Sequence, residues 1–285
     1  MNKLNLIIGG VPEHFNLPWH QLIENPSNTL SNLNLTWKDF RGGTGAMCKA
    51  LRSGEIDIAI ILTEGIVKDI IAGNPSKIVQ TYVQSPLLWG IHVSATSSLY
   101  QMEDIQNTTV AISRYGSGSH LMSYVLAARH YWKTELLKFN VVHNLEGAVQ
   151  ALTDGKADYF LWEHFTTKPL VDQGIFRRIG DCPTPWPCFV IAIREEILNE
   201  NSEEISWVLK AINEKTTNFK TIPQIEQIIA NRYEQKVEDI QEWLKITEWS
   251  HSLPTTSEID KVQTTLHELE LIQQKTAYQN LIFSL

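Results

Sequence analysis

The sequence is poor in cysteine and has no excess of basic residues, and each shortage excludes a class of protein. Only three cysteines, Cys48, Cys182 and Cys188, occur among the 285 residues. An odd number does not suggest a disulfide framework, and the spacing of Cys182 and Cys188 matches no zinc site. We therefore expect free thiols and no bound metal. Basic residues number 24 against 32 acidic ones, a net charge of −8, which argues against nucleic-acid binding.

Long apolar runs are also missing. None approaches the roughly 20 residues that a membrane-spanning helix needs, so we expect no membrane insertion. The apolar run from Leu6 to Ile8 is too short for a secretory signal. This predicts a cytoplasmic protein, or a periplasmic one if the natural precursor is longer at its N-terminus. Hydrophobic residues make up 43% of the chain, which excludes a disordered protein and suffices for one large domain or two ordinary ones.

Signatures of common enzymes and cofactor sites are absent as well. Cys48 and Leu121 stand where the third glycine of a dinucleotide fingerprint would follow two glycine-rich loops. The segment 116–119 is one residue out of register with the nucleophile elbow of serine hydrolases, and no His-Glu-x-x-His motif occurs. We therefore expect no cofactor.

The chain does contain an internal repeat. Residues 50–57 and 151–158 both read Ala-Leu-x-x-Gly-x-x-Asp, and each copy leads into an apolar run followed by a glutamate. This pattern is typical of a helix that ends at a glycine and precedes a buried strand. Strand-like and helical stretches alternate in the same order before both copies. The predicted strands are 4–9, 35–40, 58–62, 109–113, 139–142 and 159–162, and the predicted helices cover 19–24 and 117–132 and begin near 44 and 145.

Two β-α-β-α-β units therefore follow one another. Because short continuous apolar strands joined by helices are typical of parallel sheets, we predict an α/β fold with two Rossmann-like lobes of mainly parallel sheet. After about Glu195 the apolar spacing becomes helical, which predicts a C-terminal tail of about four helices. One of them should begin near Thr255, where Glu258 completes a capping box. The acidic residues of this tail are interpreted as a solvated face.

Candidate site residues come from the loops at the carboxyl ends of the strands, where ligands of open α/β sheets bind. Two loops are rich in glycine, serine and threonine and run into helices, whose free N–H groups suit a carboxylate, sulfonate or phosphate. The alternative is that the glycines only make turns and the hydroxyls only cap helices. The recurrence of such loops in both halves favours binding. The first half supplies Glu13, His14, Gly43, Thr44, Gly45, Thr63 and Glu64. The second half supplies Tyr115, Ser117, Gly118, Ser119, His120, Glu163 and His164.

Two tryptophans complete this set. Trp89 and Trp186 lie where the chain is expected to cross between the lobes. Aromatic side chains at such places can line a ligand pocket. With nine tryptophans in the chain, a place in the hydrophobic core is the alternative for each.

These segments resemble the type II periplasmic-binding-protein superfamily, within it the branch of sulfonate, taurine and nitrate solute-binding proteins and thiamine-pyrimidine precursor synthases. The resemblance is carried by residues 42–46, 50–59, 63–65 and 112–120 and by the second repeat copy, and it covers roughly residues 4–220. It implies two lobes joined by a two-stranded hinge, with 1–88 and 189–285 in lobe one and 89–188 in lobe two. It also implies a small-molecule ligand held between the lobes, and an ABC transporter permease as the partner of transport members.

The resemblance and the loops together favour non-catalytic binding of a small anionic or zwitterionic organic ligand. The glycine-rich loops would hold its acidic group, the glutamates and histidines its polar or basic portion, and Trp89, Tyr115 or Trp186 its apolar parts. One alternative is an enzyme on the same scaffold, such as a pyrimidine-precursor synthase, with His14 or Glu64 as proton carrier. The cysteine-rich cluster of those synthases is missing here. The other alternative is a ligand sensor or interaction protein.

Overall fold

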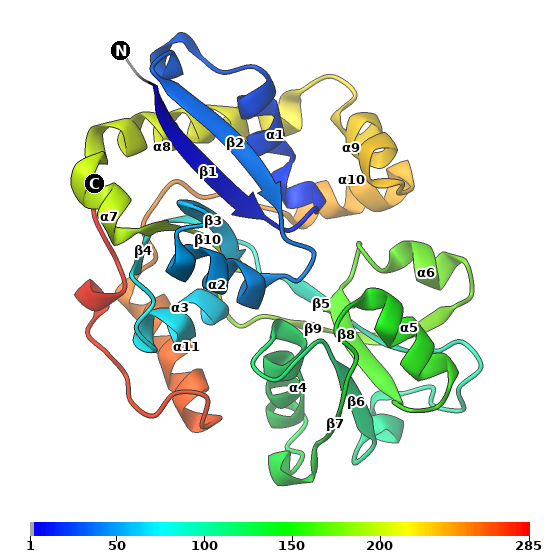
Figure 1. The fold of residues 1–285 in the computed structure, drawn as a ribbon. Helices are drawn as coiled ribbons and strands as arrows, with labels where there is room; N and C mark the ends of the chain where they lie inside the picture. Colours follow the sequence, from blue (N-terminus) through cyan, green and yellow to red (C-terminus); the bar gives the residue numbers. More distant parts are fainter. Residues whose placement is uncertain (1–2) are drawn as a thin grey trace. The chain divides into compact units, whose positions relative to one another are not determined.

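The computed structural model describes residues 3–285, which divide into two compact units (Figure 1). Unit 1 is Met1–Ser85 with Trp186–Leu285, and unit 2 is Pro86–Pro185. The chain thus passes from one unit to the other twice. The sequence predicted crossings after residues 88 and 188, and the structure places them after Ser85 and Pro185. Trp89 therefore lies in unit 2, as predicted, whereas Trp186 lies in unit 1 and not in the predicted lobe two.

A five-stranded sheet in the order β2-β1-β3-β10-β4 forms the centre of unit 1. β1 pairs in parallel with β2 and β3, whereas β10 runs antiparallel between β3 and β4. All five residues of β3 are buried, as expected for a strand covered on both faces. The strands are β1 Leu4–Gly10, β2 Leu33–Asp39, β3 Ile58–Leu62, β4 Ser76–Val83 and β10 Phe189–Arg194.

The sheet of unit 2 has the equivalent order, β7-β6-β8-β5-β9. Here β6 pairs in parallel with β7 and β8, and β5 is the antiparallel strand between β8 and β9. In each unit the antiparallel strand is therefore the one that follows a crossing. The strands are β5 Leu88–Ser94, β6 Thr109–Ile112, β7 Lys138–Val141, β8 Tyr159–Glu163 and β9 Phe176–Pro183. The predicted α/β class with two similar halves is confirmed.

Helices flank both sheets. In unit 1, α1 packs against α8, and α11 packs against α3. Its helices are α1 Leu17–Glu24, α2 Thr44–Ser53, α3 Thr63–Ile71, α7 Glu195–Glu200, α8 Ser202–Asn218, α9 Ile225–Tyr233, α10 Val237–Ile246 and α11 Thr256–Glu268. Those of unit 2 are α4 Gly118–Arg129, α5 Leu145–Thr153 and α6 Lys168–Asp172.

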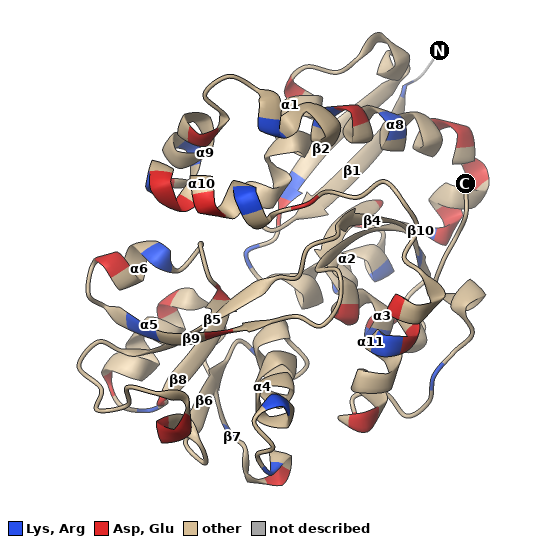
Figure 2. Ribbon diagram, turned by 180° about the vertical axis from the view of Figure 1, so that it is seen from behind, with Lys and Arg blue, Asp and Glu red and all other residues tan. Residues whose placement is uncertain are grey.

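The predicted helical tail is confirmed and covers α7 to α11. Acidic residues are spread along it (Figure 2), many of them in first turns, where they complement the helix dipole. α11 begins as expected: Thr255 caps it, and Glu258 accepts a hydrogen bond from the Thr255 N–H at 2.7 Å. The tail is more than a solvated appendage, because Trp243 of α10 is buried in the core.

The two repeat copies have the same structural role in their units. Gly54 and Gly155 both end a helix in the left-handed conformation, with φ of 72° and 68°. Asp57 then accepts a hydrogen bond from the N–H of Ile7 in β1 at 2.9 Å, and Asp158 accepts one from Thr109 in β6 at 2.7 Å. The repeat therefore fixes the helix end and the neighbouring strand in both halves.

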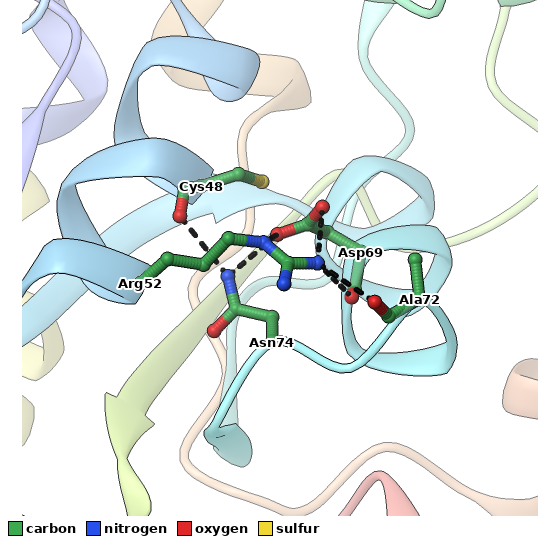
Figure 3. Close-up of polar contacts among 5 residues, drawn as sticks. All are labelled: Cys48, Arg52, Asp69, Ala72 and Asn74. Atoms are coloured by element: carbon green, nitrogen blue, oxygen red, sulfur yellow. Dashed lines mark hydrogen bonds and ion pairs between the residues drawn. The ribbon is translucent and has the colours of Figure 1, made fainter.

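In unit 1 the first copy also secures α3 (Figure 3). Arg52 of α2 donates hydrogen bonds to the Asp69 carboxylate at 3.0 Å and to the carbonyl oxygens of Asp69 and Ala72 at 3.0 and 3.1 Å. Asn74 donates to the Cys48 carbonyl oxygen at 3.1 Å and to Asp69 Oδ2 at 2.6 Å. These bonds satisfy carbonyl groups at the end of α3 that have no partner within the helix. They hold the helix whose first turn carries Thr63 and Glu64.

All three cysteines are free and buried. No helix within residues 3–285 is long and apolar enough to span a bilayer.

Candidate functional site

In unit 1 the candidate loops follow β1, β2 and β3. The loop after β2 ends at Gly43, whose φ of 65° suits glycine and which caps α2 without a side chain. Gly43 O accepts hydrogen bonds from the N–H groups of Ala46 and Met47. The N–H groups of Thr44 and Gly45 have no acceptor within residues 3–285. This helix start therefore offers two donors to an anion.

The first turn of α3 packs directly against the first turn of α2. A Cβ atom on Gly65 would lie only 2.2 Å from Thr44 Cγ2, so glycine is required for this approach. Thr63 and Glu64 thereby lie at the same edge of the sheet as the α2 start.

Glu64 is a carboxyl group inside the protein. Its residue is 1% exposed, its Oε2 accepts a hydrogen bond from Trp186 Nε1 at 2.8 Å, and its Oε1 has no partner within residues 3–285. Burial raises the pKa of Glu64 from 4.5 to about 7, against the lowering effect of its own N–H and of the Trp186 indole. Glu64 can therefore hold or lose a proton near neutral pH.

Thr63 and Glu64 also fix the chain just after its second crossing. Thr63 Oγ1 donates to the Pro187 carbonyl oxygen at 2.6 Å, and the Thr63 N–H donates to the Cys188 carbonyl oxygen at 3.0 Å. Trp186 is therefore held in a buried position by its indole and by the residues that follow it. The pairing of Trp186 with Glu64 could not be predicted from the sequence, because the two residues are 122 positions apart.

His14 lies in an aromatic environment. Its ring centroid is 5.0 Å from that of Phe15 and 4.4 Å from that of Trp243 in α10. Burial lowers the pKa of His14 from 6.5 to about 3, so its imidazole is neutral at ordinary pH. The neighbouring Glu13 is 9% exposed. This environment is that of a core histidine and disfavours His14 as a proton carrier.

In unit 2 the serine side chains at the start of α4 make hydrogen bonds within their own loop and first helical turn. Ser117 caps the helix by accepting the His120 N–H at 3.3 Å, and Ser119 Oγ accepts the Ser113 N–H at 3.0 Å. The hydroxyl oxygens of Ser117 and Ser119 lie 3.1 Å apart. The N–H groups of Gly118 and Ser119 have no acceptor among the described residues. The hydroxyl groups thus shape the loop, and the backbone offers the donors.

Aromatic side chains lie beside this helix start. Tyr115 is 66% exposed. Its ring meets those of His120 and Phe139 at centroid distances of 5.3 and 6.0 Å. His120 is 6% exposed, and its Nδ1 accepts the Gly116 N–H at 3.2 Å. Tyr115 is the exposed apolar surface nearest to the α4 start in sequence.

The remaining candidates of unit 2 lie at the end of β8 and on its neighbour β5. Glu163 is buried, and its Oε2 accepts the N–H and hydroxyl of Thr166 at 2.6 and 2.8 Å. Burial raises its pKa, against the lowering effect of these bonds. His164 Nδ1 lies 2.7 Å from Asp181 Oδ1, a partner that the sequence did not indicate. Trp89, opposite Glu163, is buried, and its Nε1 has no acceptor within residues 3–285.

The candidates thus gather at one sheet edge in each unit, and each edge carries a helix start with two free donors. No group of three or more histidine, cysteine or acidic side chains that could hold a metal occurs in residues 3–285. The free donors at both helix starts suit an anion.

Comparison with solved structures identifies the fold. The Candida albicans CA3427 gene product, described as exhibiting the generic periplasmic-binding-protein fold, is 26% identical and aligns over 95% of this chain and 92% of its own, with a TM-score of 0.86. This chain has the periplasmic-binding-protein fold. The Ca3427-like PBP (periplasmic binding protein) family model matches residues 89–182. No curated protein matches the chain.

Two other proteins with the periplasmic-binding-protein fold are similar over nearly their whole length. The alkanesulfonate-binding protein SsuA of Xanthomonas axonopodis pv. citri, bound to MOPS, is 15% identical, covers 100% of both chains and has a TM-score of 0.84. The periplasmic aliphatic sulphonate-binding protein SsuA of Escherichia coli is 19% identical, covers 98% of this chain and 92% of its own, with a TM-score of 0.73. The periplasmic-binding-protein fold expected from the sequence is confirmed.

Proposed function

We propose that this protein binds a small anionic or zwitterionic organic molecule without chemically changing it. In each unit the free N–H groups at one helix start, α2 in unit 1 and α4 in unit 2, would hold an acidic group. The observation that carries this proposal is their recurrence: two helices at equivalent places in the two units each start with two donors that lack an acceptor within residues 3–285.

The relatives support the same ligand chemistry. Two of them are described as binding sulfonates, which are anions with an organic tail. The exposed ring of Tyr115 beside the α4 start suits an apolar part of such a molecule. That both units hold one ligand, that Trp89 and Trp186 contribute to its pocket, and that a permease is a further partner remain predictions from the sequence.

Thermal unfolding in the presence of sulfonates, carboxylates and phosphonates tests the proposal. A ligand at 100 times its dissociation constant stabilises the folded state by about 2.7 kcal/mol, so binding of any of these anions should raise the melting temperature clearly. If none of them shifts the melting temperature, the proposed function is wrong.

A proline variant tests the role of the helix start. Gly118→Pro removes one free N–H at the first position of α4, where proline is tolerated and where the extended Ser117, with ψ of 169°, can precede it. Because a hydrogen bond to a charged group contributes about 1.5–3 kcal/mol, titration calorimetry should show a 10- to 100-fold loss of anion affinity.

Thr256→Pro is the matched control. It places proline at the first position of α11, after a similarly extended Thr255 with ψ of 156°, at a helix start outside the candidate site. The control should bind the anion like the wild-type protein. An equal loss in both variants would show that proline acts through stability and not through the site.

A further inference from the structure

The carboxyl group of Glu64 is incompletely bonded inside the protein. The Trp186 Nε1–H donates a hydrogen bond to Oε2 at 2.8 Å, whereas Oε1 is buried and has no hydrogen-bond partner within residues 3–285. An unpaired carboxylate oxygen in such a place is costly, and the cost is removed when a positively charged donor pairs with it. The unpaired oxygen is therefore an acceptor that still lacks its donor.

The position of Glu64 relates it to the anion donors of unit 1. Glu64 lies in the first turn of α3, and Gly65, the next residue, packs against Thr44 in the first turn of α2. The free N–H groups of Thr44 and Gly45 thus lie at the same sheet edge as the carboxyl group. The first turns of two neighbouring helices thus carry donors that suit a negative group and an acceptor that suits a positive one.

Trp186 and Thr63 keep the carboxyl group in place. The indole N–H holds Oε2, and the segment that carries Trp186 is itself fixed by the two bonds of Thr63 to Pro187 and Cys188. With one oxygen fixed by a buried and anchored side chain, the other keeps a defined position. Glu64 is therefore a buried acceptor with a fixed orientation, unlike a mobile surface glutamate.

We propose that Glu64 makes the site selective for ligands that carry a protonated amine in addition to the acidic group. The amine donates a hydrogen bond to Oε1 and pairs with the carboxylate charge. This inference rests on the proposed function and narrows its ligand class from anions in general to zwitterions. Trp186 acts in it as a positioning residue.

Three matched pairs of compounds test the inference. The members of each pair differ only in the amine: 2-aminoethanesulfonate and ethanesulfonate, 3-aminopropanoate and propanoate, and 2-aminoethylphosphonate and ethylphosphonate. Titration calorimetry at pH 7.5 should show at least tenfold tighter binding of the aminated member in every pair whose acidic group is accepted. If the two members of a pair bind equally, the inference is wrong while the proposed function stands. If none of the six compounds binds, both fail.

Substitution of Glu64 assigns the selectivity to this residue. Glu64→Gln keeps an oxygen for the Trp186 indole and replaces the acceptor Oε1 by an amide group without charge. The tenfold preference for the aminated compounds should disappear, because the amide carries no charge to pair with the amine. Glu55→Gln is the control, because Glu55 is an exposed glutamate paired with Lys38. A preference that persists in Glu64→Gln would overturn the inference.

A measurement on the wild-type protein provides a test that does not depend on the variant's folding. Burial raises the pKa of Glu64 to about 7, and the hydrogen bonds from its own N–H and from the Trp186 indole oppose this rise. Glu64 therefore holds a proton in part of the molecules near neutral pH, and pairing with an amine releases it. Calorimetry in buffers of different ionisation enthalpy should show a proton release that decreases as the pH rises from 7 to 8.5. Binding of an aminated ligand without this release would contradict the inference.

Discussion

At the scale of single residues, the buried Glu64 makes the stability of the fold depend on pH. Its pKa is 4.5 in the unfolded chain and about 7 in the folded one. A raised carboxyl pKa favours the folded state while the group is protonated. The contribution is therefore fully present below pH 4.5 and is lost as the pH rises through 7. This rise of the pKa of Glu64 corresponds to about 3 kcal/mol.

Glu64→Gln removes this dependence, because glutamine has no charge to bury. Relative to the wild-type protein, the variant should gain about 2–3 kcal/mol of unfolding free energy between pH 5 and pH 8. Urea denaturation of both proteins at the two pH values measures the difference. A constant difference would show that Glu64 does not titrate in this range.

Residues also show where prediction from sequence ends. The loop after β1 is recognisable from its position, but the burial of His14 comes from Trp243, 229 positions further along the chain. Glu64 acquires its partner Trp186 in the same way, across 122 positions. Local sequence identifies which side chains reach the sheet edge. Which of them become partners is decided by segments that fold onto that edge from elsewhere.

At the scale of secondary-structure elements, the two repeat glycines allow the cost of a left-handed helix end to be measured. Gly155 has φ of 68°, and a Cβ atom there would meet nothing within 4 Å. Gly155→Ala should therefore lower the unfolding free energy by about 1–2 kcal/mol through backbone strain alone. Gly155→Asn should lose less, because asparagine tolerates this conformation. Chemical denaturation of the three proteins gives the comparison, and equal stability of Gly155→Ala and wild type would contradict the account.

Gly54→Ala should cost more than Gly155→Ala. In addition to the same strain at φ of 72°, its Cβ would lie 3.2 Å from Arg194 Nη1. That guanidinium group pairs with Asp57 at 3.2 Å. The new methyl group therefore disturbs an ion pair that Gly155→Ala leaves alone.

The strands that could be predicted from the sequence are those marked by a recognisable pattern in the neighbouring residues. β3 and β8 follow the repeat as short apolar runs, and their parallel neighbours β1 and β6 have the same character. β10 is just as apolar, with five of its six residues buried, yet its antiparallel place between β3 and β4 was not foreseen. The direction of a strand is set by where the chain re-enters the unit. The spacing of apolar residues does not indicate this direction.

At the scale of the whole molecule, the division into two units predicts different behaviour of fragments. Residues 86–185 contain all five strands of the unit 2 sheet and should fold alone with a cooperative urea transition. Residues 1–85 should remain unfolded, because β3 and β4 are joined only through β10. Far-UV circular dichroism and urea titration of the two fragments test this. A cooperative transition in the 1–85 fragment would show that β10 is dispensable.

The place of β10 also determines the order in which a ribosome can complete the molecule. Phe189 is made 189 − 83 = 106 residues after β4 ends at Val83. At ~10 residues per second this is a delay of roughly ten seconds, during which the middle of the chain is finished and can fold first. For that time the apolar segments that form β3 and β4 lack their partner strand, and exposed segments of this kind promote aggregation. We therefore expect the newborn N-terminal part to need protection from aggregation until β10 has been synthesised.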